Sequence, residues 1–281
     1  MINLLLEPFT YLYMQKAIAI CAVVGGLCAF LSSYLMLKGW SLMGDALAHA
    51  VVPGVALSHI FKVPYVVGAF FPGMLAVGGM AFLKQKTKLS EDATIGLVFT
   101  AFLASGLLLI SLNPVEVDLA TIVLGNILAI SEYDIWQMLS ISAICFMVLA
   151  LKWKDFMIIF FDETHARSIG LPVTLLQIIF FTILSLSIVA ALQTVGAFLV
   201  IAMVITPGAT AYLLTDRFSN LIFISIGLGV FTGGFGVYLS YFLDIHSGGL
   251  VVVLQTTIFL SAFLFAPKHG FIKTRLISVK V

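Results

Sequence analysis

Two side chains that can bind a metal ion, those of Asp45 and His49, lie within an apolar stretch of helix length at residues 39–61. If this stretch is helical, their i, i+4 spacing puts both side chains on one face, about one turn apart. A carboxylate oxygen and an imidazole nitrogen placed in this way can share one divalent transition metal. A charge inside a membrane-spanning segment costs at least ~2.5–3.5 kcal/mol on insertion scales, so it indicates a functional site. The simpler alternative is an Asp–His hydrogen bond that fastens the helix to a neighbour.

Two ligands are too few for tight binding, and this suits a transporter because conduction requires that the ion can leave. A second copy of the chain, placed across a two-fold axis, would complete four ligands. Gly44, Pro53 and Gly54 interrupt the same stretch, as is typical of a broken helix that lines a pathway. His59 lies near the outer end of the stretch, where we expect it to be only interfacial.

The composition places the chain in a membrane. Of its 281 residues, 62% are hydrophobic and only 10% are charged, whereas a soluble domain has about a quarter of its residues charged. The formal net charge of +1 decides nothing, and the absence of a basic cluster on a soluble face argues against binding of nucleic acid. Cys21, Cys28 and Cys145 lie in apolar runs without a pairing pattern, so we expect them to be buried small hydrophobic residues.

The apolar runs predict a single all-α membrane domain over residues 1–281, a helix bundle of about eight or nine transmembrane helices. A crossing needs about 20 apolar residues of helix, because lipid offers no hydrogen bonds to the backbone. The run 119–130 is too short to cross, and we expect a re-entrant or half helix there. The expected crossings are residues 17–37, 39–61, 63–83, 93–115, 135–151, two helices within 171–215 with a turn near Gly196, 218–243 and 247–267.

The basic residues orient these crossings. With nine crossings and the N-terminus outside, all of the 14 Lys and Arg residues except Lys16 and Lys62 lie on the cytoplasmic side, as expected for a bacterial inner-membrane protein. The outer face is then net negative and would modestly concentrate cations, although acids are also free to occur anywhere outside. The acids on that face are Glu7, Glu116, Asp118, Glu132, Asp134 and Asp244.

The longest polar stretch away from the termini, residues 152–171, lies on the cytoplasmic side in this orientation. Acids at 162 and 163, a basic residue in the final turn, Gly170 and then Pro172 predict a short capped helix. Such a helix could dock into a cytoplasmic partner, or it could be an ordinary amphipathic connector.

One later span is rich in glycine: Gly227, Gly229, Gly233, Gly234 and Gly236. Small residues at such spacing allow helices to approach closely. We expect packing within the chain, and a dimer seam is the alternative.

At this point the sequence resembles the membrane permease subunits of bacterial ABC importers for manganese, iron or zinc, the ABC-3 metal permease family. The resemblance covers nearly the whole chain and rests most firmly on residues 38–56, KGWSLMGDALAHAVVPGVA. Weaker matches are EDATIG at 91–96, residues 163–172, QTVG at 193–196 and TPGATA at 206–211. The stretch 244–249, DIHSGG, departs from the family, in which Pro is more frequent than His at position 246, and this leaves the role of His246 open.

The resemblance implies how the protein assembles and works. It implies a homodimer or a pair of similar permeases, two cytoplasmic ABC ATPase subunits, and a periplasmic or lipid-anchored metal-binding protein. Asp45 and His49 map onto the family's metal-coordinating pair. The helix containing Glu163, Ala166, Arg167 and Gly170 would be the coupling helix that contacts the ATPase. No cofactor would be bound permanently, and a divalent ion of Mn, Fe or Zn would be transported.

The chain carries no P-loop motif G-x-x-x-x-G-K-[ST], so we expect no ATPase activity in this polypeptide and assign hydrolysis to a partner. The strongest rival is a secondary transporter that exchanges protons for cations. Such carriers usually have more than one intramembrane carboxylate and an inverted repeat, and only one buried acid and no clear repeat are found. A non-transporting scaffold would have little use for an Asp–His pair within a span.

Overall fold

The computed structural model describes residues 6–40, 42–112, 127 and 130–266. All regular elements in these residues are helical, so the all-α class is confirmed. The elements are η1 (Glu7–Thr10), α2 (Leu12–Lys38), α3 (Met43–Ala50), α4 (Val52–Phe61), α5 (Tyr65–Lys86), α6 (Glu91–Leu112), α8 (Glu132–Leu151), α9 (Trp153–Phe161), α10 (Glu163–Ser168), α11 (Val173–Val195), α12 (Ala197–Leu214), α13 (Phe218–Leu243) and α14 (Ser247–Phe265).

Within the described residues, 9 segments are long and apolar enough to cross a membrane, and these are the nine crossings that the sequence predicts. Helices α3 and α4 together form one of them, Met43–Phe61. The predicted turn near Gly196 separates α11 from α12, and Gly196 has a φ of 83°, which favours glycine. The predicted half helix at 119–130 lies, except for residues 127 and 130, outside the part of the chain that the structure describes.

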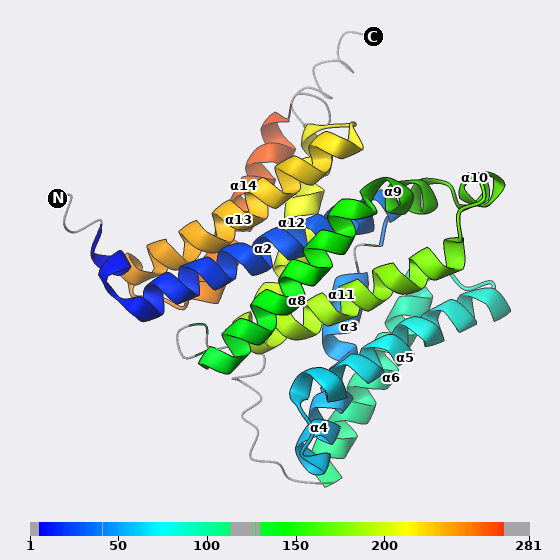
Figure 1. The fold of residues 1–281 in the computed structure, drawn as a ribbon, viewed down its shortest axis with the longest axis horizontal. Coiled ribbons are helices and arrows are strands. Elements are labelled where there is room, and N and C mark those ends of the chain that lie inside the picture. The colour runs from blue at the N-terminus through cyan, green and yellow to red at the C-terminus, as the bar shows by residue number, and fades with distance from the viewer. Residues whose placement is uncertain (1–5, 41, 113–126, 128–129, 267–281) are drawn as a thin grey trace.

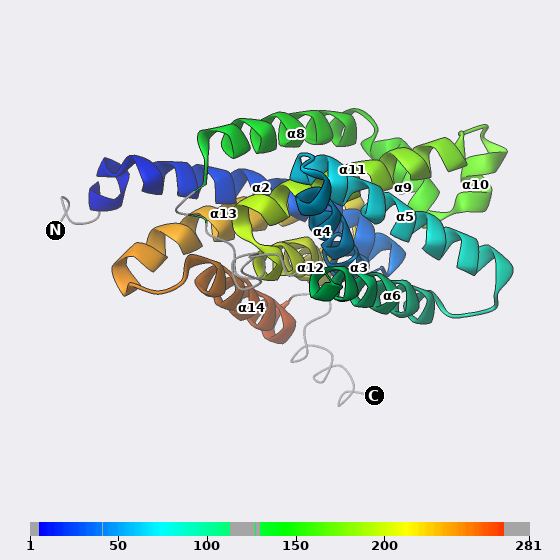
Figure 2. The ribbon, with the colours of Figure 1, turned by 90° about the horizontal axis from the view of Figure 1, so that it is seen from below.

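The helices form two groups, which are joined by α11 and by a direct contact of α12 with α3 (Figure 1). One group contains α2, α12, α13 and α14, and the other contains α3, α4, α5 and α6. Helix α11 contacts members of both groups. Seen from below, α8 covers one face of the molecule, whereas α6 and α14 lie toward the opposite face (Figure 2). The metal-site candidates on α3 therefore belong to the group that α11 connects to the rest of the bundle.

Helix α2 is the most deeply packed crossing, with 78% of its apolar window buried inside the chain. Its contact with α13 is made through backbone rather than through large side chains. A Cβ at Gly229 would collide with the carbonyl oxygen of Gly25, and a Cβ at Gly233 would collide with that of Cys21. Gly229 and Gly233 therefore serve packing within the chain, as we expected from their spacing, whereas a Cβ at Gly227 would meet nothing within 4 Å.

An aromatic cluster near the C-terminal end of α2 connects four helices. The ring of Tyr34, which is completely buried, lies 6.0 Å from the ring of Phe156 on α9, 5.6 Å from that of Phe180 on α11 and 5.2 Å from that of Phe218 on α13. The Tyr34 hydroxyl donates a hydrogen bond to the carbonyl oxygen of Trp153 at 3.3 Å. Aromatic contacts of this kind contribute about 0.5–1.5 kcal/mol each beyond their buried area. The apolar strip at 156–161 is thus part of α9, which packs against α2 and α11.

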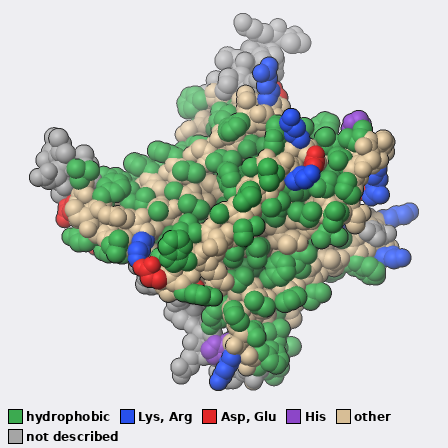
Figure 3. Space-filling model, viewed as in Figure 1, with side chains coloured by type: hydrophobic (Ala, Val, Ile, Leu, Met, Phe, Trp, Pro, Cys, Tyr) green, Lys and Arg blue, Asp and Glu red, His purple; other side chains and the backbone are tan. Residues whose placement is uncertain are grey.

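The outer surface suits a bilayer. Many large apolar side chains point outward, among them Phe71, Phe82, Trp136 and Phe223, each more than 60% exposed. In Figure 3 hydrophobic side chains cover most of the visible face, and Lys and Arg side chains gather toward the side where α5, α9 and α10 end. This distribution agrees with the predicted cytoplasmic side.

The close contact of α2 with α13 can be tested with a matched pair of substitutions. We expect Gly229→Ala to lower the free energy of unfolding by about 1–3 kcal/mol, because the new methyl group must displace the backbone of α2. Gly227→Ala on the same helix meets open space, so it should leave stability unchanged or raise it by at most about 1 kcal/mol. Thermal unfolding in detergent measures both. Equal stability of the two variants would contradict the packing described here.

Candidate metal site and coupling helix

Helix α3 buries every residue except the two that could bind a metal. Met43, Gly44, Ala46, Leu47, Ala48 and Ala50 are buried, whereas the side chains of Asp45 and His49 keep 37% and 30% of their surface exposed. The polar side of α3 is therefore the only side of this helix that its neighbours leave partly open. An open polar face inside a crossing is what an ion pathway requires.

The two side chains point toward the same place. The Nε2 atom of His49 lies 3.4 Å from the Oδ1 atom of Asp45. A metal ion about 2.1 Å from both atoms would be bound at an angle of about 108°, which is close to the tetrahedral value. The ring of His49 also packs edge-on against Phe99 of α6 at 5.1 Å between centroids, which holds the imidazole in place. The predicted pair is thus brought together with a geometry that fits one divalent ion.

The interruption predicted in this crossing is a local one. Helix α3 ends at Ala50 and α4 begins at Val52, while Val51 between them keeps helical dihedral angles, with φ −74° and ψ −23°. Pro53 has no N–H, so it cannot donate the usual helical hydrogen bond to the carbonyl of His49, four residues earlier. The break is fitted closely into the neighbouring helices, because a Cβ at Gly106 of α6 would meet the backbone nitrogen of Pro53.

A single copy of the chain offers only two ligands at this place. Among the described residues, no group of three or more His, Cys, Asp or Glu side chains could hold a metal ion. His59 is exposed at the end of α4, about 21 Å along the helix from Asp45, and its interfacial position stays a prediction. His246 has a structural use that the sequence did not reveal: its Nδ1 atom caps α14 and accepts a hydrogen bond from the Gly249 amide at 3.3 Å.

The predicted short helix at the cytoplasmic side is α10. Asp162 caps its start by accepting a hydrogen bond from the His165 amide at 3.0 Å. Arg167 pairs with Glu163 at 2.7 Å, and this hydrogen bond is the main reason that the pKa of Glu163 is lowered. The lowered pKa means that the pair stabilises the helix at neutral pH and is lost only when the pH falls through that lowered value. Gly170, with a φ of 80°, then turns the chain toward α11.

The four predicted coupling residues have different surroundings. Arg167 and Gly170 are exposed and Glu163 is partly exposed, whereas Ala166 is completely buried and anchors α10 to the rest of the chain. Two exposed apolar residues flank the helix and were not singled out from the sequence: Phe161 is 79% exposed and Ile169 is 53% exposed. Large apolar side chains beside a polar helix were the signal that could have found them.

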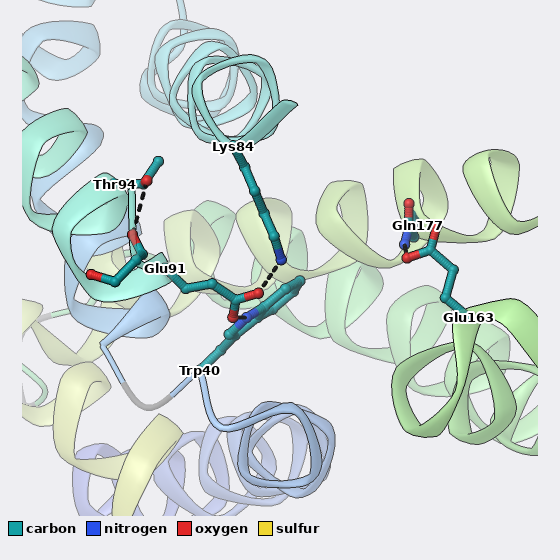
Figure 4. A network of polar contacts seen from close by, with 7 residues as sticks. Trp40, Lys84, Glu91, Thr94, Glu163 and Gln177 are labelled. Atoms are coloured by element: carbon teal, nitrogen blue, oxygen red, sulfur yellow. Dashed lines mark hydrogen bonds and ion pairs between the residues drawn. The ribbon is translucent and has the colours of Figure 1, made fainter. Parts of the chain in front are cut away.

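A polar network next to α3 was also missed. Glu91, at the start of α6, accepts hydrogen bonds from the indole of Trp40 and from the ammonium group of Lys84 (Figure 4). Trp40 belongs to the short connection that leads into α3, so the network ties this connection to α5 and α6. The EDATIG motif at 91–96 marked Glu91, but the sequence did not show its partners.

Comparison with known proteins identifies the family. The model of the ABC 3 transport family matches residues 10–266. This chain belongs to the ABC 3 transport family. It is 58% identical over 275 residues to the chelated iron transport system membrane protein YfeC of Yersinia pestis, covering 98% of this chain and 94% of that protein. It is 47% identical over 266 residues to the manganese transport system membrane protein MntB of Synechocystis, covering 95% and 87%.

A solved structure supports the fold of this ABC 3 family member. The structure of PsaBC from Streptococcus pneumoniae in complex with Fab matches with a TM-score of 0.86 and 33% sequence identity, covering 98% of this chain and 100% of that one. The chain is therefore a multi-pass inner-membrane permease of the ABC type, as its resemblance to that family predicts.

The cap of α10 can be tested by hydrogen exchange of the intact permease. We expect Asp162→Ala to remove the cap, which costs about 1 kcal/mol, and to speed exchange of the amides of residues 163–168 about fivefold. Asp155→Ala removes the same charge nearby but breaks only an exposed ion pair with Lys152, so exchange in α10 should not change. Unchanged exchange after Asp162→Ala would contradict the capping role.

Proposed function

We propose that this chain is the permease of an ATP-driven importer of divalent metal ions, and that Asp45 and His49 bind the ion transiently during passage. The observation that carries the proposal is the arrangement on α3: two metal-binding side chains 3.4 Å apart form the only partly open side of an otherwise buried helix. Two relatives support a metal as cargo. The relative that is 58% identical is named for transport of chelated iron, and the one that is 47% identical is named for transport of manganese.

The transport pathway in this proposal requires two permease copies. One copy contributes a carboxylate and an imidazole, and a second copy across a two-fold axis would complete four ligands. Manganese, ferrous iron and zinc all accept oxygen and nitrogen ligands, so the proposal covers these three ions. A periplasmic or lipid-anchored metal-binding protein would deliver the ion at the outer face. Because ligands must be deprotonated to bind, protonation of Asp45 or His49 would release it.

ATP hydrolysis is assigned to a cytoplasmic ABC ATPase dimer that docks on α10. The exposed Arg167, Phe161 and Ile169 would provide the docking surface, while the buried Ala166 would connect it to the chain. Movement of α10 can reach the metal site through direct packing, because α10 contacts α11 and α11 contacts α3. Alternating access would follow when this movement opens the inner side of the pathway.

Substitution of the metal ligands tests the site. We expect Asp45→Asn and His49→Ala each to reduce accumulation of radioactive manganese or iron at least tenfold, because one ligand per copy cannot hold the ion. His59→Ala, which changes an exposed histidine of the same crossing, should transport normally. Copurification of the ATPase subunit with each variant establishes that assembly is intact. Normal uptake by the Asp45 or His49 variant would overturn the site assignment.

The energy source separates this proposal from proton-coupled exchange. In vesicles that contain the permease, its ATPase and its binding protein, we expect metal uptake to require ATP inside and to survive collapse of the proton gradient. Uptake that stops with a protonophore while ATP is present would instead favour the secondary transporter.

A further inference from the structure

A cavity of about 530 Å³ lies where the cytoplasmic ends of several helices meet. It is bounded by the connection from α2 to α3, by α5 and α6, and by α10 and α11. Figure 4 shows Trp40, Lys84 and Glu91 on one side of this space, and Glu163 and Gln177 on the other. Glu163 and Arg167 of α10 line the cavity, but the roles derived so far leave its interior unused.

The cavity has a charged mouth and an apolar interior. Lys84 lies near the cytoplasmic end of α5, whereas Met74 lines the cavity ten residues earlier, about 15 Å deeper along the same helix. Val77 of α5 and Ile178 and Phe181 of α11 line the walls between them. A ligand that fills this space must therefore combine a polar head with an apolar chain.

The charged side chains that line the cavity sum to one net positive charge, because three cationic groups face two carboxylates. Lys84 pairs with Glu91, and Arg167 pairs with Glu163. Lys38 is partly buried and attracts both of these carboxylates from a distance, but it forms no ion pair within the described residues; its Nζ atom lies 5.8 Å from the centre of the Trp40 ring. Lys86 and Lys88, which follow on the exposed end of α5 and its loop, add to the positive potential. The mouth is thus suited to an anion.

The cavity lies apart from the proposed ion pathway. Met43 lines the cavity, while Asp45 follows two residues later, and two residues correspond to a rotation of about 200° around a helix. The cavity and the Asp45–His49 pair are therefore on opposite sides of α3. An excess of positive charge would also repel a divalent cation, so this space is not a second metal site.

We propose that this cavity binds an anionic phospholipid of the inner leaflet. Its phosphate would lie at Lys38 and Lys84, and an acyl chain would follow the wall formed by α5 and α11. Basic pockets between transmembrane helices on the cytoplasmic side bind anionic headgroups, and tryptophan is enriched at this depth. Because α10 and the connection into α3 both border the cavity, the bound lipid stabilises the relative position of the coupling helix and the metal-site helix.

Lipid binding by the purified full-length chain tests the proposal. We expect phosphatidylglycerol, added to the protein in neutral detergent, to raise the melting temperature and to remain bound in native mass spectrometry, whereas phosphatidylcholine does neither. Lys38→Gln should weaken phosphatidylglycerol binding about fivefold, the effect of removing one lysine near an anionic surface. Lys38→Arg should retain binding. Lys152→Gln removes an exposed cytoplasmic lysine outside the cavity and should bind like the wild type.

A second variant keeps the test valid if Lys38→Gln fails to fold. Gly78 lines the cavity and has open space around its Cα, so Gly78→Leu should fill the cavity and prevent binding without changing any charge. Gly227→Leu, which also enters open space but on α13, is the matched control and should bind normally. Equal binding of the two phospholipids, or unchanged binding by Gly78→Leu, would overturn the proposal. So would protection by inorganic phosphate alone without protection by phosphatidylglycerol.

Discussion

The cost of placing a carboxylate inside the bilayer governs the arrangement of this molecule. Asp45 lies in a crossing, where a charge that faced lipid would be strongly unfavourable. The chain resolves this by surrounding α3 with α5, α6, α11 and α12, so that small and apolar residues of α3 are buried and the charged side alone remains partly open. His49 lies beside the carboxylate at a distance that a shared ion can bridge. The site thus depends on the packing of helices that contribute no ligand themselves.

Lipid also offers no hydrogen-bond partners to the backbone, and this explains a contact between α2 and α12. Pro207 lies inside α12 and has no N–H, so one of the hydrogen bonds of this helix is missing. Ser32 of α2 compensates at this position: its hydroxyl accepts a hydrogen bond from the Gly208 amide and donates one to the Ile205 carbonyl, both at 3.1 Å. The buried hydroxyl of Ser32 therefore satisfies backbone groups next to the proline, and it connects α12 to α2 at the same time.

The sequence predicted those features that depend on local pattern. The nine crossings follow from runs of about 20 apolar residues, and the i, i+4 spacing of Asp45 and His49 already determined that they share a face. It could not predict features that depend on contacts between distant residues. Trp40 and Glu91 are 51 positions apart, and Phe156 is buried only because α2 and α11 bring Tyr34 and Phe180 to it. Which side of α3 stays open is likewise decided by neighbouring helices.

The aromatic cluster around Tyr34 has a mechanical consequence. It joins α9, which precedes α10, to one end of α2, a helix of 27 residues that is about 40 Å long. Further along, α2 lies against Gly229 and Gly233 of α13, where the two backbones are in close contact. A rigid helix held at such a contact can tilt around it. A tilt of about 5° around its midpoint would move its two ends about 2 Å in opposite directions, so that a displacement at one end of α2 would reappear at the other end with the opposite sign.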